Sequence, residues 1–396
     1  MLYTLILGGI IGAIVWGFIS LVNVCVGFLW YDFPKQFGNF PFYTLIICLI
    51  GGLVIGIWHK YAGNYPEEMK AVFQKIKKDG KYHYQNISKM TISAFLPLVF
   101  GGSVGPESGL VGIIAALCCW LSDKLKLLFN KLKDFTEISI SAALGAIFGS
   151  PLFGFTEPIE NENGKTVIPK SSRIILCFLA IFGALGAAIL LKNFFGGSSG
   201  LPSLTDYSVA QKEWLFLIPL CLIGVIGGII YNLSKRFCDF LAKPLREKPI
   251  LSALCSGLIL GIIGTLLPLT MFSGEEQITE IANSYQAIGA VTLILSGTIK
   301  LFVTNSCISL GFRGGHFFPT IFSGVAIGFG IGIIFGINST FAAAVITTAL
   351  LSYIMKKPFA VILLLMICFP ISALPAMILA VVFGNFRLPK NTKNSQ

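Results

Sequence analysis

The stretch GGSVGPESG, residues 101–109, lies between two strongly apolar runs, Met90–Phe100 and Leu110–Leu121. Glycines, a proline and a carboxylate are unexpected between segments of membrane-like hydropathy. The glycines permit a tight turn, and a proline suits the first helical turn because its missing N–H would have no intrahelical partner there. We therefore expect a helix to begin inside the membrane, next to Pro106.

Composition indicates an integral membrane protein. Of 396 residues, 55% are hydrophobic and 12% are charged, about half of the ~25% typical of soluble domains. Several apolar runs are shorter than the ~20 residues that cross a bilayer, so we expect an all-α polytopic protein with broken and tilted helices. The runs are Leu2–Trp30, Pro41–Trp58, Met90–Phe100, Leu110–Leu121, Ile138–Phe155, Ile174–Leu191, Trp214–Tyr231, Ile250–Leu269, Ala287–Val303, Phe317–Ile337, Phe341–Met355 and Phe359–Phe383.

The charge distribution predicts an orientation. Lys-rich segments such as 60–89, 124–133 and 235–248 indicate the cytoplasmic side, whereas a loop with three glutamates and no Lys or Arg, around Glu275, indicates the outside. We expect both termini to be cytoplasmic, the first run to be a retained span rather than a signal peptide, and the membrane to be the cell membrane. Positive-inside sorting and contact with membrane lipid account for the net charge of +11, so no nucleic-acid partner is expected.

Cofactor and enzyme signals are missing from the sequence. The ten cysteines form no C-x-x-C pair, and the three histidines are scattered, so neither a metal nor another cofactor is predicted. His59 flanks a Lys-rich loop, where a solvated or interfacial histidine is the usual case. No HExxH motif is present, and the loops are too short for a nucleotide domain, so we do not expect an enzyme.

A faint repeat divides the chain. GGSVGP (101–106) and GGHFFP (314–319) share the pattern G-G-x-x-x-P, and each is followed by a proline that opens an apolar helix, Pro151 and Pro358. Two halves, 1–200 and 201–386, are predicted, with a polar cytoplasmic tail at 387–396 and no separate soluble domain. Interrupted segments at corresponding places in two halves point to a transport site near the bilayer midplane.

Helix N-termini inside a membrane favour the binding of an anion. Each start presents unpaired N–H groups and roughly half a positive charge from the helix dipole. In hydrocarbon this is costly unless an anion or water fills the gap. The segment AGNYPE (62–67) is a third candidate start, in which Glu67 and Glu68 would lie in the first helical turn as partners of the dipole.

With these motifs the sequence resembles the CLC family of chloride channels and chloride/proton exchangers, from roughly Pro41 to Gly384. The segment GFRGGHFFPTIFSG (311–324) is similar to the family's G-x-x-G-G-x-F-x-P. GGSVGPESG is similar to G-R-E-G-P, AGNYPE to G-S-G-I-P-E, and GSPLFGFTEPIE (149–160) to the P-L-x-G helix. The resemblance implies inverted-topology repeats, a homodimer and one chloride path per subunit.

The resemblance also implies which groups line the path. They are backbone amides of the three helix starts: Ala62, Gly63, Ser103, Val104, Gly105, His316 and Phe317. Gly63 replaces the family's serine, and after Phe386 only a polar tail follows, without a counterpart of the family's tyrosine. We therefore expect a central site with few side chains. The ring of His316 could raise anion affinity when protonated, but we expect it to pack outward.

Departures from the family pattern predict the mode of transport. Alignment of Gly105-Pro106 with G-P places Val104 at the gate position, where the family has a glutamate that competes with the anion and carries protons. The inner proton-carrying glutamate corresponds to Asn161. Because neither residue titrates, the sequence predicts a passive anion channel.

Two glutamates leave a coupled chloride/proton antiporter open as the alternative. Glu107, one residue past Pro106, is either a functional intramembrane carboxyl or a helix-start residue that satisfies its own first-turn amides. Glu160 is either a proton carrier or part of a solvated helix end. A membrane scaffold that conducts nothing is a third possibility.

Overall fold

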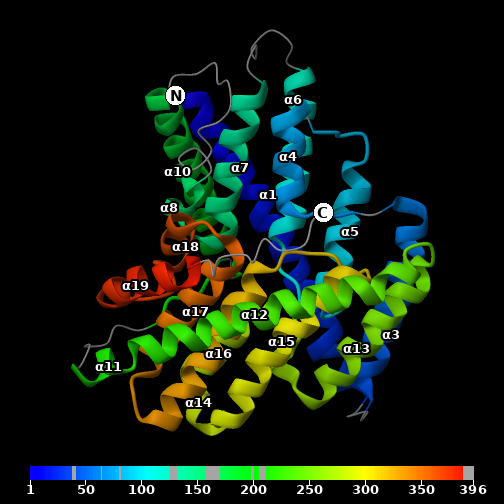
Figure 1. Ribbon diagram of the computed structural model, residues 1–396. Helices are drawn as coiled ribbons and strands as arrows, with labels where there is room; N and C mark the ends of the chain where they lie inside the picture. The colour runs from blue at the N-terminus through cyan, green and yellow to red at the C-terminus, as the bar shows by residue number, and fades with distance from the viewer. Residues whose placement is uncertain are drawn as a thin grey trace, which may run out of the picture.

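The computed structural model describes residues 1–37, 42–63, 65–79, 82–124, 132–156, 170–197, 200–204 and 211–386. Within these residues the protein is helical and contains no strand (Figure 1). A π-helical segment, Gly27–Asp32, links the first two helices. The α-helices are α1 (Leu2–Val26), α2 (Phe33–Phe37), α3 (Tyr43–Ala62), α4 (Met69–Asp79), α5 (Ile87–Val99), α6 (Glu107–Lys124), α7 (Leu132–Phe148), α8 (Pro151–Gly154), α10 (Lys170–Phe195), α11 (Gln211–Leu215), α12 (Leu217–Ala242), α13 (Pro249–Leu266), α14 (Glu275–Ile288), α15 (Ala290–Leu310), α16 (Phe317–Phe335), α17 (Ser339–Met355), α18 (Pro358–Leu365) and α19 (Leu374–Asn385).

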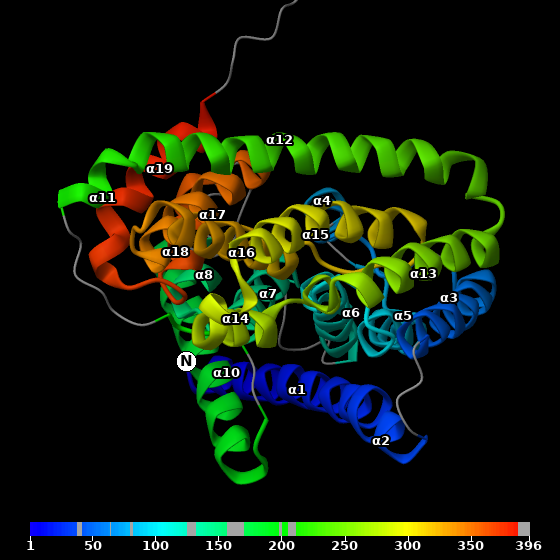
Figure 2. The same cartoon turned by 90° about the horizontal axis from the view of Figure 1, so that it is seen from below.

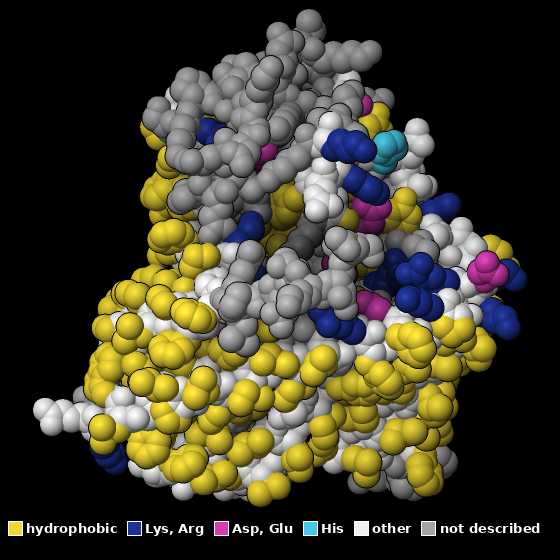
Figure 3. Space-filling model, in the orientation of Figure 1, with side chains coloured by type: hydrophobic (Ala, Val, Ile, Leu, Met, Phe, Trp, Pro, Cys, Tyr) yellow, Lys and Arg dark blue, Asp and Glu magenta, His cyan; other side chains and the backbone are white. Residues whose placement is uncertain are grey.

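Helix lengths confirm a polytopic membrane protein with interrupted helices. In the described part of the chain, seven helical segments are long and apolar enough to span a bilayer. Other apolar helices, including α5, α7 and α17, are shorter than a span. Apolar side chains on α12 such as Leu222, Ile226 and Phe237 are exposed, and Figure 3 shows hydrophobic side chains covering the lower part of one face below a band of Lys and Arg. An apolar surface of this kind suits lipid.

The most buried candidate span lies at the centre of the fold. Figure 2 shows α12 along one side of the molecule and α1 along the opposite side, with α6, α7, α15 and α16 between them. In α16, 83% of an 18-residue apolar stretch is buried inside the protein. Small residues allow close packing elsewhere: a Cβ at Gly8 of α1 would lie 2.0 Å from the Ala180 oxygen of α10. Such approaches are the usual way in which helices associate in membranes.

Corresponding elements of the two predicted halves touch each other. The loop before α6 contacts the loop before α16, and α8, which Pro151 opens, packs on α18, which Pro358 opens. The Ser150 hydroxyl donates to the Leu363 carbonyl across this contact at 3.0 Å. The matched motifs therefore meet in the interior.

Two predicted continuous runs are interrupted. The run Phe359–Phe383 divides into α18 and α19, because Pro370 adopts an extended conformation and proline cannot continue a helix. The run Ile138–Phe155 divides into α7 and α8 at Gly149, whose φ is +66°. The sequence predicts each run to be continuous because the residues on both sides of the break are apolar.

Candidate functional site

Two helix N-termini meet in the interior, as the repeated motif predicts. α6 begins at Glu107 and α16 begins at Phe317. The preceding loops are joined by a reciprocal pair of hydrogen bonds: the Gly105 N–H donates to the Gly315 carbonyl at 2.9 Å, and the Gly315 N–H donates to the Gly105 carbonyl at 2.8 Å. This bridge holds the positive ends of two helix dipoles beside each other.

The Glu107 carboxylate occupies this junction. Its side chain is 0% exposed, and Oε1 accepts a hydrogen bond from the Phe317 N–H at 2.8 Å. The backbone N–H groups of Glu107 itself and of Phe318 also stabilise the carboxylate. Glu107 therefore does more than satisfy the first turn of its own helix, because it binds amides at the start of α16 as well.

The second carboxylate oxygen is different. Glu107 Oε2 is buried and has no hydrogen-bond partner within the described residues. A buried carboxylate oxygen without a partner costs free energy. The oxygen that lacks a partner is the natural place for a proton or for a water molecule.

Two glycines provide the space that the carboxylate fills. A Cβ at Gly315 would lie 1.9 Å from Cδ and from Oε1 of Glu107, and a Cβ at Gly105 would lie 2.0 Å from Oε2. Both distances are far below van der Waals contact. The glycines of the bridge are therefore needed for a negatively charged group to approach these helix starts.

Val104 and Ser103 lie behind the bridge. The Val104 side chain is fully buried in an apolar cluster with Phe312, and its N–H donates to the Gly102 carbonyl at 2.8 Å. The Ser103 hydroxyl lies 3.1 Å from the Thr304 hydroxyl. The residue that aligns with the family's gate is thus a packing residue, three positions before the carboxylate at the helix junction.

The third predicted helix start has another arrangement. Ala62 ends α3, and the Gly63 N–H donates to the His59 carbonyl at 3.0 Å. α4 begins only at Met69, so the expectation that Glu67 and Glu68 lie in its first turn is wrong. Both carboxylates are close enough to lysines for ion pairs: Glu67 with Lys75 at 2.5 Å and Glu68 with Lys235 at 3.2 Å.

His59 is buried, contrary to the expectation of a solvated or interfacial side chain. It is 7% exposed, and its Nδ1 and Nε2 lie 3.0 Å from the carbonyl oxygens of Gly63 and Gly311. A neutral imidazole has one N–H and can donate to only one of these carbonyls, whereas the protonated ring can donate to both. His59 links two of the loops that carry predicted anion-site amides.

The His316 ring packs against aromatic neighbours. It stacks on Phe317, with centroids 4.5 Å apart, and its centroid lies 5.9 Å from that of Tyr231 on α12. Asn161 and Glu160, and the tail 387–396, lie outside the described residues. In the described part of the chain, no group of three His, Cys, Asp or Glu residues could hold a metal.

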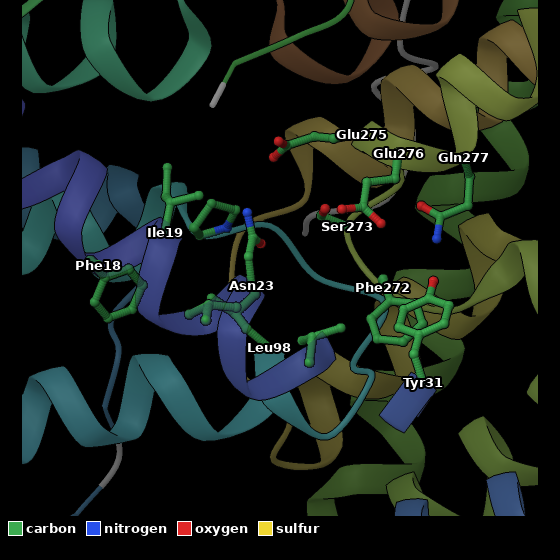
Figure 4. A pocket seen from close by; sticks show the side chains of 13 residues that line it. Phe18, Ile19, Asn23, Tyr31, Leu98, Phe272, Ser273, Glu275, Glu276 and Gln277 are labelled. Atoms are coloured by element: carbon green, nitrogen blue, oxygen red, sulfur yellow. The ribbon is translucent and has the colours of Figure 1, made fainter. Parts of the chain in front are cut away.

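Two cavities lie next to the loops of this site. The first has a volume of about 70 Å³ and is lined by Pro106, Phe272 and Glu275, together with residues of α1 (Figure 4). The second has a volume of about 340 Å³, and its lining includes the basic side chains Arg246 and Arg313. The first borders the start of α6, and the second borders the loop before α16.

Comparison with known proteins places this arrangement in a family. A family model described as voltage-gated chloride channel matches residues 46–387. The chain belongs to the CLC family. Like other members of this family it is a multi-pass membrane protein of anion transport, and the resemblance seen in the motifs is confirmed.

Relatives of this CLC chain include bacterial proteins. YfeO of Salmonella paratyphi A, a provisionally assigned ion-transport protein, is 24% identical over 320 residues, which cover 78% of this chain and 74% of that protein. YfeO of Salmonella newport matches to the same extent.

Solved structures share the CLC fold. A CLC-type fluoride/proton antiporter superposes with a TM-score of 0.77 at 20% identity, covering 97% of this chain and 93% of the other. A slow cyanobacterial Cl⁻/H⁺ antiporter gives a TM-score of 0.78 at 20% identity with the same coverage. The comparison confirms the predicted fold class. Members of the family are transporters and channels rather than enzymes.

Proposed function

We propose that this chain transports a small anion, chloride, past the junction of α6 and α16, and that Glu107 is the gate. The observation that carries the proposal is the Glu107 carboxylate itself, fully buried and accepting the Phe317 N–H at 2.8 Å. Backbone N–H groups at helix starts bind anions. A carboxylate on these amides occupies the position that a free anion needs.

Protonation provides a way to open this gate. The hydrogen bonds of an ionised carboxylate are about twice as strong as those of a neutral group, and the helix dipoles favour the charged form further. A proton on Glu107 removes that advantage and allows chloride to replace the carboxyl group. Anion passage then depends on pH, and proton and chloride movements are linked because both compete for one site.

The two cavities suit this path as its approaches. The Arg246 and Arg313 side chains beside the larger cavity raise the local concentration of anions. The smaller cavity reaches Pro106, the residue before the gate. In this proposal both termini are cytoplasmic, the halves are 1–200 and 201–386, and the protein is a homodimer in the cell membrane. These features rest on the charge distribution and on the family resemblance.

Flux measurements on reconstituted protein test the function. Liposomes loaded with chloride are diluted into a medium of low chloride, which creates an outward chloride gradient. Chloride efflux and external pH are then recorded together. We expect efflux that accelerates as pH falls, and in Glu107→Gln, which imitates the protonated gate, efflux that no longer depends on pH. The exposed Glu280→Gln is the matched control. A pH-dependent Glu107→Gln variant would exclude Glu107 as the gate.

Passive conduction is the second candidate. Val104, at the position aligned with the family's gate, is packed in an apolar cluster and cannot carry a proton. A passive channel moves chloride without uphill proton uptake and without a response to Glu107→Gln. Uphill proton movement driven by the chloride gradient identifies an antiporter, and no flux of either ion would favour the scaffold.

A further inference from the structure

A second carboxyl group lies close to the proposed gate. Glu275 begins α14, directly after Gly274, whose φ is +108°. Its half-buried side chain lines the smaller cavity, which Pro106 and the α1 residue Asn23 also line (Figure 4). The negative charge of Glu107 acts on Glu275, so the two carboxyl groups are electrostatic neighbours although they belong to different halves of the chain.

The groups around Glu275 are mostly acidic or neutral. Glu276 from the same helix and Tyr31 from the end of the first span line the same cavity, and Cys368 lies within electrostatic reach. Lys300 is a cation that contacts the segment before α14. Its ammonium is committed to the carbonyl oxygens of Leu269, Met271 and Phe272, at 3.3, 2.7 and 3.1 Å, and lies 4.4 Å from the Phe322 ring centroid.

This environment keeps Glu275 protonated near neutral pH. α14 lies between the spans α13 and α15 and is not itself a candidate span. Burial, and then the charges of Glu107 and Glu276, raise the pKa of Glu275 to about 8. A group with such a pKa gives up and takes back a proton readily at physiological pH.

We propose that Glu275 relays protons between the solution on the α14 face and the Glu107 carboxyl group. In the inward step the O–H bond of Glu275 breaks, and a proton binds Glu107 through cavity water, at the oxygen Oε2 that lacks a partner. Glu275 is left as a carboxylate and regains a proton from solution. The 70 Å³ of the cavity suffices, since one water needs roughly 10–15 Å³.

The relay rests on the proposed role of Glu107, and its test separates the two. Chloride efflux and proton movement are measured in liposomes over a series of pH values for the parent protein, Glu275→Gln, Glu275→Asp and Glu107→Gln. Glu280→Gln is the matched control, because Glu280 is an exposed glutamate of the same helix that does not line the cavity.

We expect Glu275→Gln to slow proton-dependent chloride efflux about a hundredfold at neutral pH, the lower end of the range for one proton-transfer group. Its pH profile should shift to lower pH, Glu275→Asp should restore part of the rate, and Glu280→Gln should match the parent. An unchanged rate and profile in Glu275→Gln would overturn the relay. Slowing in both Gln and Asp variants with the parent's pH profile would also overturn it, as a structural effect.

The outcome for Glu107→Gln identifies which proposal fails. If this variant loses its pH dependence while Glu275→Gln behaves like the parent, the gate stands and the relay is wrong. If Glu107→Gln keeps the pH dependence, the gate is wrong and the relay to it falls too. Should Glu275→Gln fail to fold, Glu275→Asp decides: a shifted pH profile supports the relay, and the parent's pH profile, whatever the rate, overturns it.

Discussion

The starts of α6 and α16 share the pattern G-G-x-x-x-P but use it differently. In α6 the proline precedes the first helical residue, Glu107, whereas in α16 the proline is the third helical residue, after Phe317 and Phe318. The start of α16 therefore offers free N–H groups, and the start of α6 offers a carboxylate that binds them. Equal motifs give complementary sites rather than equal ones.

The register of the bridge explains this difference. Gly105, the fifth residue of one motif, pairs with Gly315, the second residue of the other. The offset places the residue after Pro106 at the junction and Val104 behind it. Position along a motif thus does not determine position in space, because the partner loop sets the register.

The largest expected effect on transport comes from filling the space that the glycines leave. In Gly315→Ala the new Cβ would meet the Glu107 carboxyl at 1.9 Å. We expect the carboxyl to be expelled, with loss of pH-dependent transport and of about 1–3 kcal/mol of stability, within the range of overpacking. Thermal unfolding in detergent and chloride efflux measure the two effects.

A double mutant sharpens this test, because the three atoms nearest to the added Cβ all belong to Glu107. In a Glu107→Ala background, Gly315→Ala should cost little, giving a coupling energy of about 1–3 kcal/mol between the two positions. Additive losses would show that Gly315 matters for its backbone and not for the space it leaves. Gly105→Ala, tested in the same cycle, compares the two sides of the bridge.

A glutamate at position 104, which aligns with the family's gate, should change transport less than Gly315→Ala does. Val104→Glu restores the family pattern G-x-E-G-P, but the carboxyl would enter an apolar cluster beside Phe312. We expect destabilisation of several kcal/mol without a second gate, because a buried charge needs partners. Val104→Ile, of similar polarity, should be tolerated. Restoration of pH-dependent efflux by Val104→Glu in Glu107→Gln would contradict the register described above.

Sequence patterns predicted much of this fold for physical reasons. Apolar runs, positive loops and the G-G-x-x-x-P repeat depend on local composition, so they predicted the membrane class, the interior helix starts and the family. The contact between Glu107 and Phe317 joins residues 210 positions apart, and motif alignment favoured Val104 because it cannot represent the register between two loops.

Two other residues show the same limit. His59 gave no signal, since its partners Gly63 and Gly311 are carbonyl groups that any residue supplies. Glu275 did have a signal, an acidic residue directly after a glycine in a loop without Lys or Arg, but only its cavity shows that it lies near Pro106, the residue before α6.

The smallest expected effect concerns the glutamates that begin α6 and α14. The raised pKa of Glu275, about 8 against an ordinary 4.5, means that the folded state holds this proton more tightly than the unfolded state. Its contribution to stability is therefore fully present below about pH 4.5 and is lost as pH rises through about 8. The stability of the parent relative to Glu275→Gln should fall between these values.

Glu107 sets part of this response, because its negative charge helps to raise the pKa of Glu275. In Glu107→Gln the loss of relative stability should begin at the same pH but end at lower pH, by a fraction of a unit or so, since the unfolded state sets the beginning and burial is the larger cause of the raised pKa. Thermal unfolding of four variants, the parent, each single Gln and the double, from about pH 5 to about pH 9 measures the shift. Identical profiles with and without Glu107 would mean that the two carboxyl groups do not interact, and the cavity would then separate the helix starts instead of connecting them.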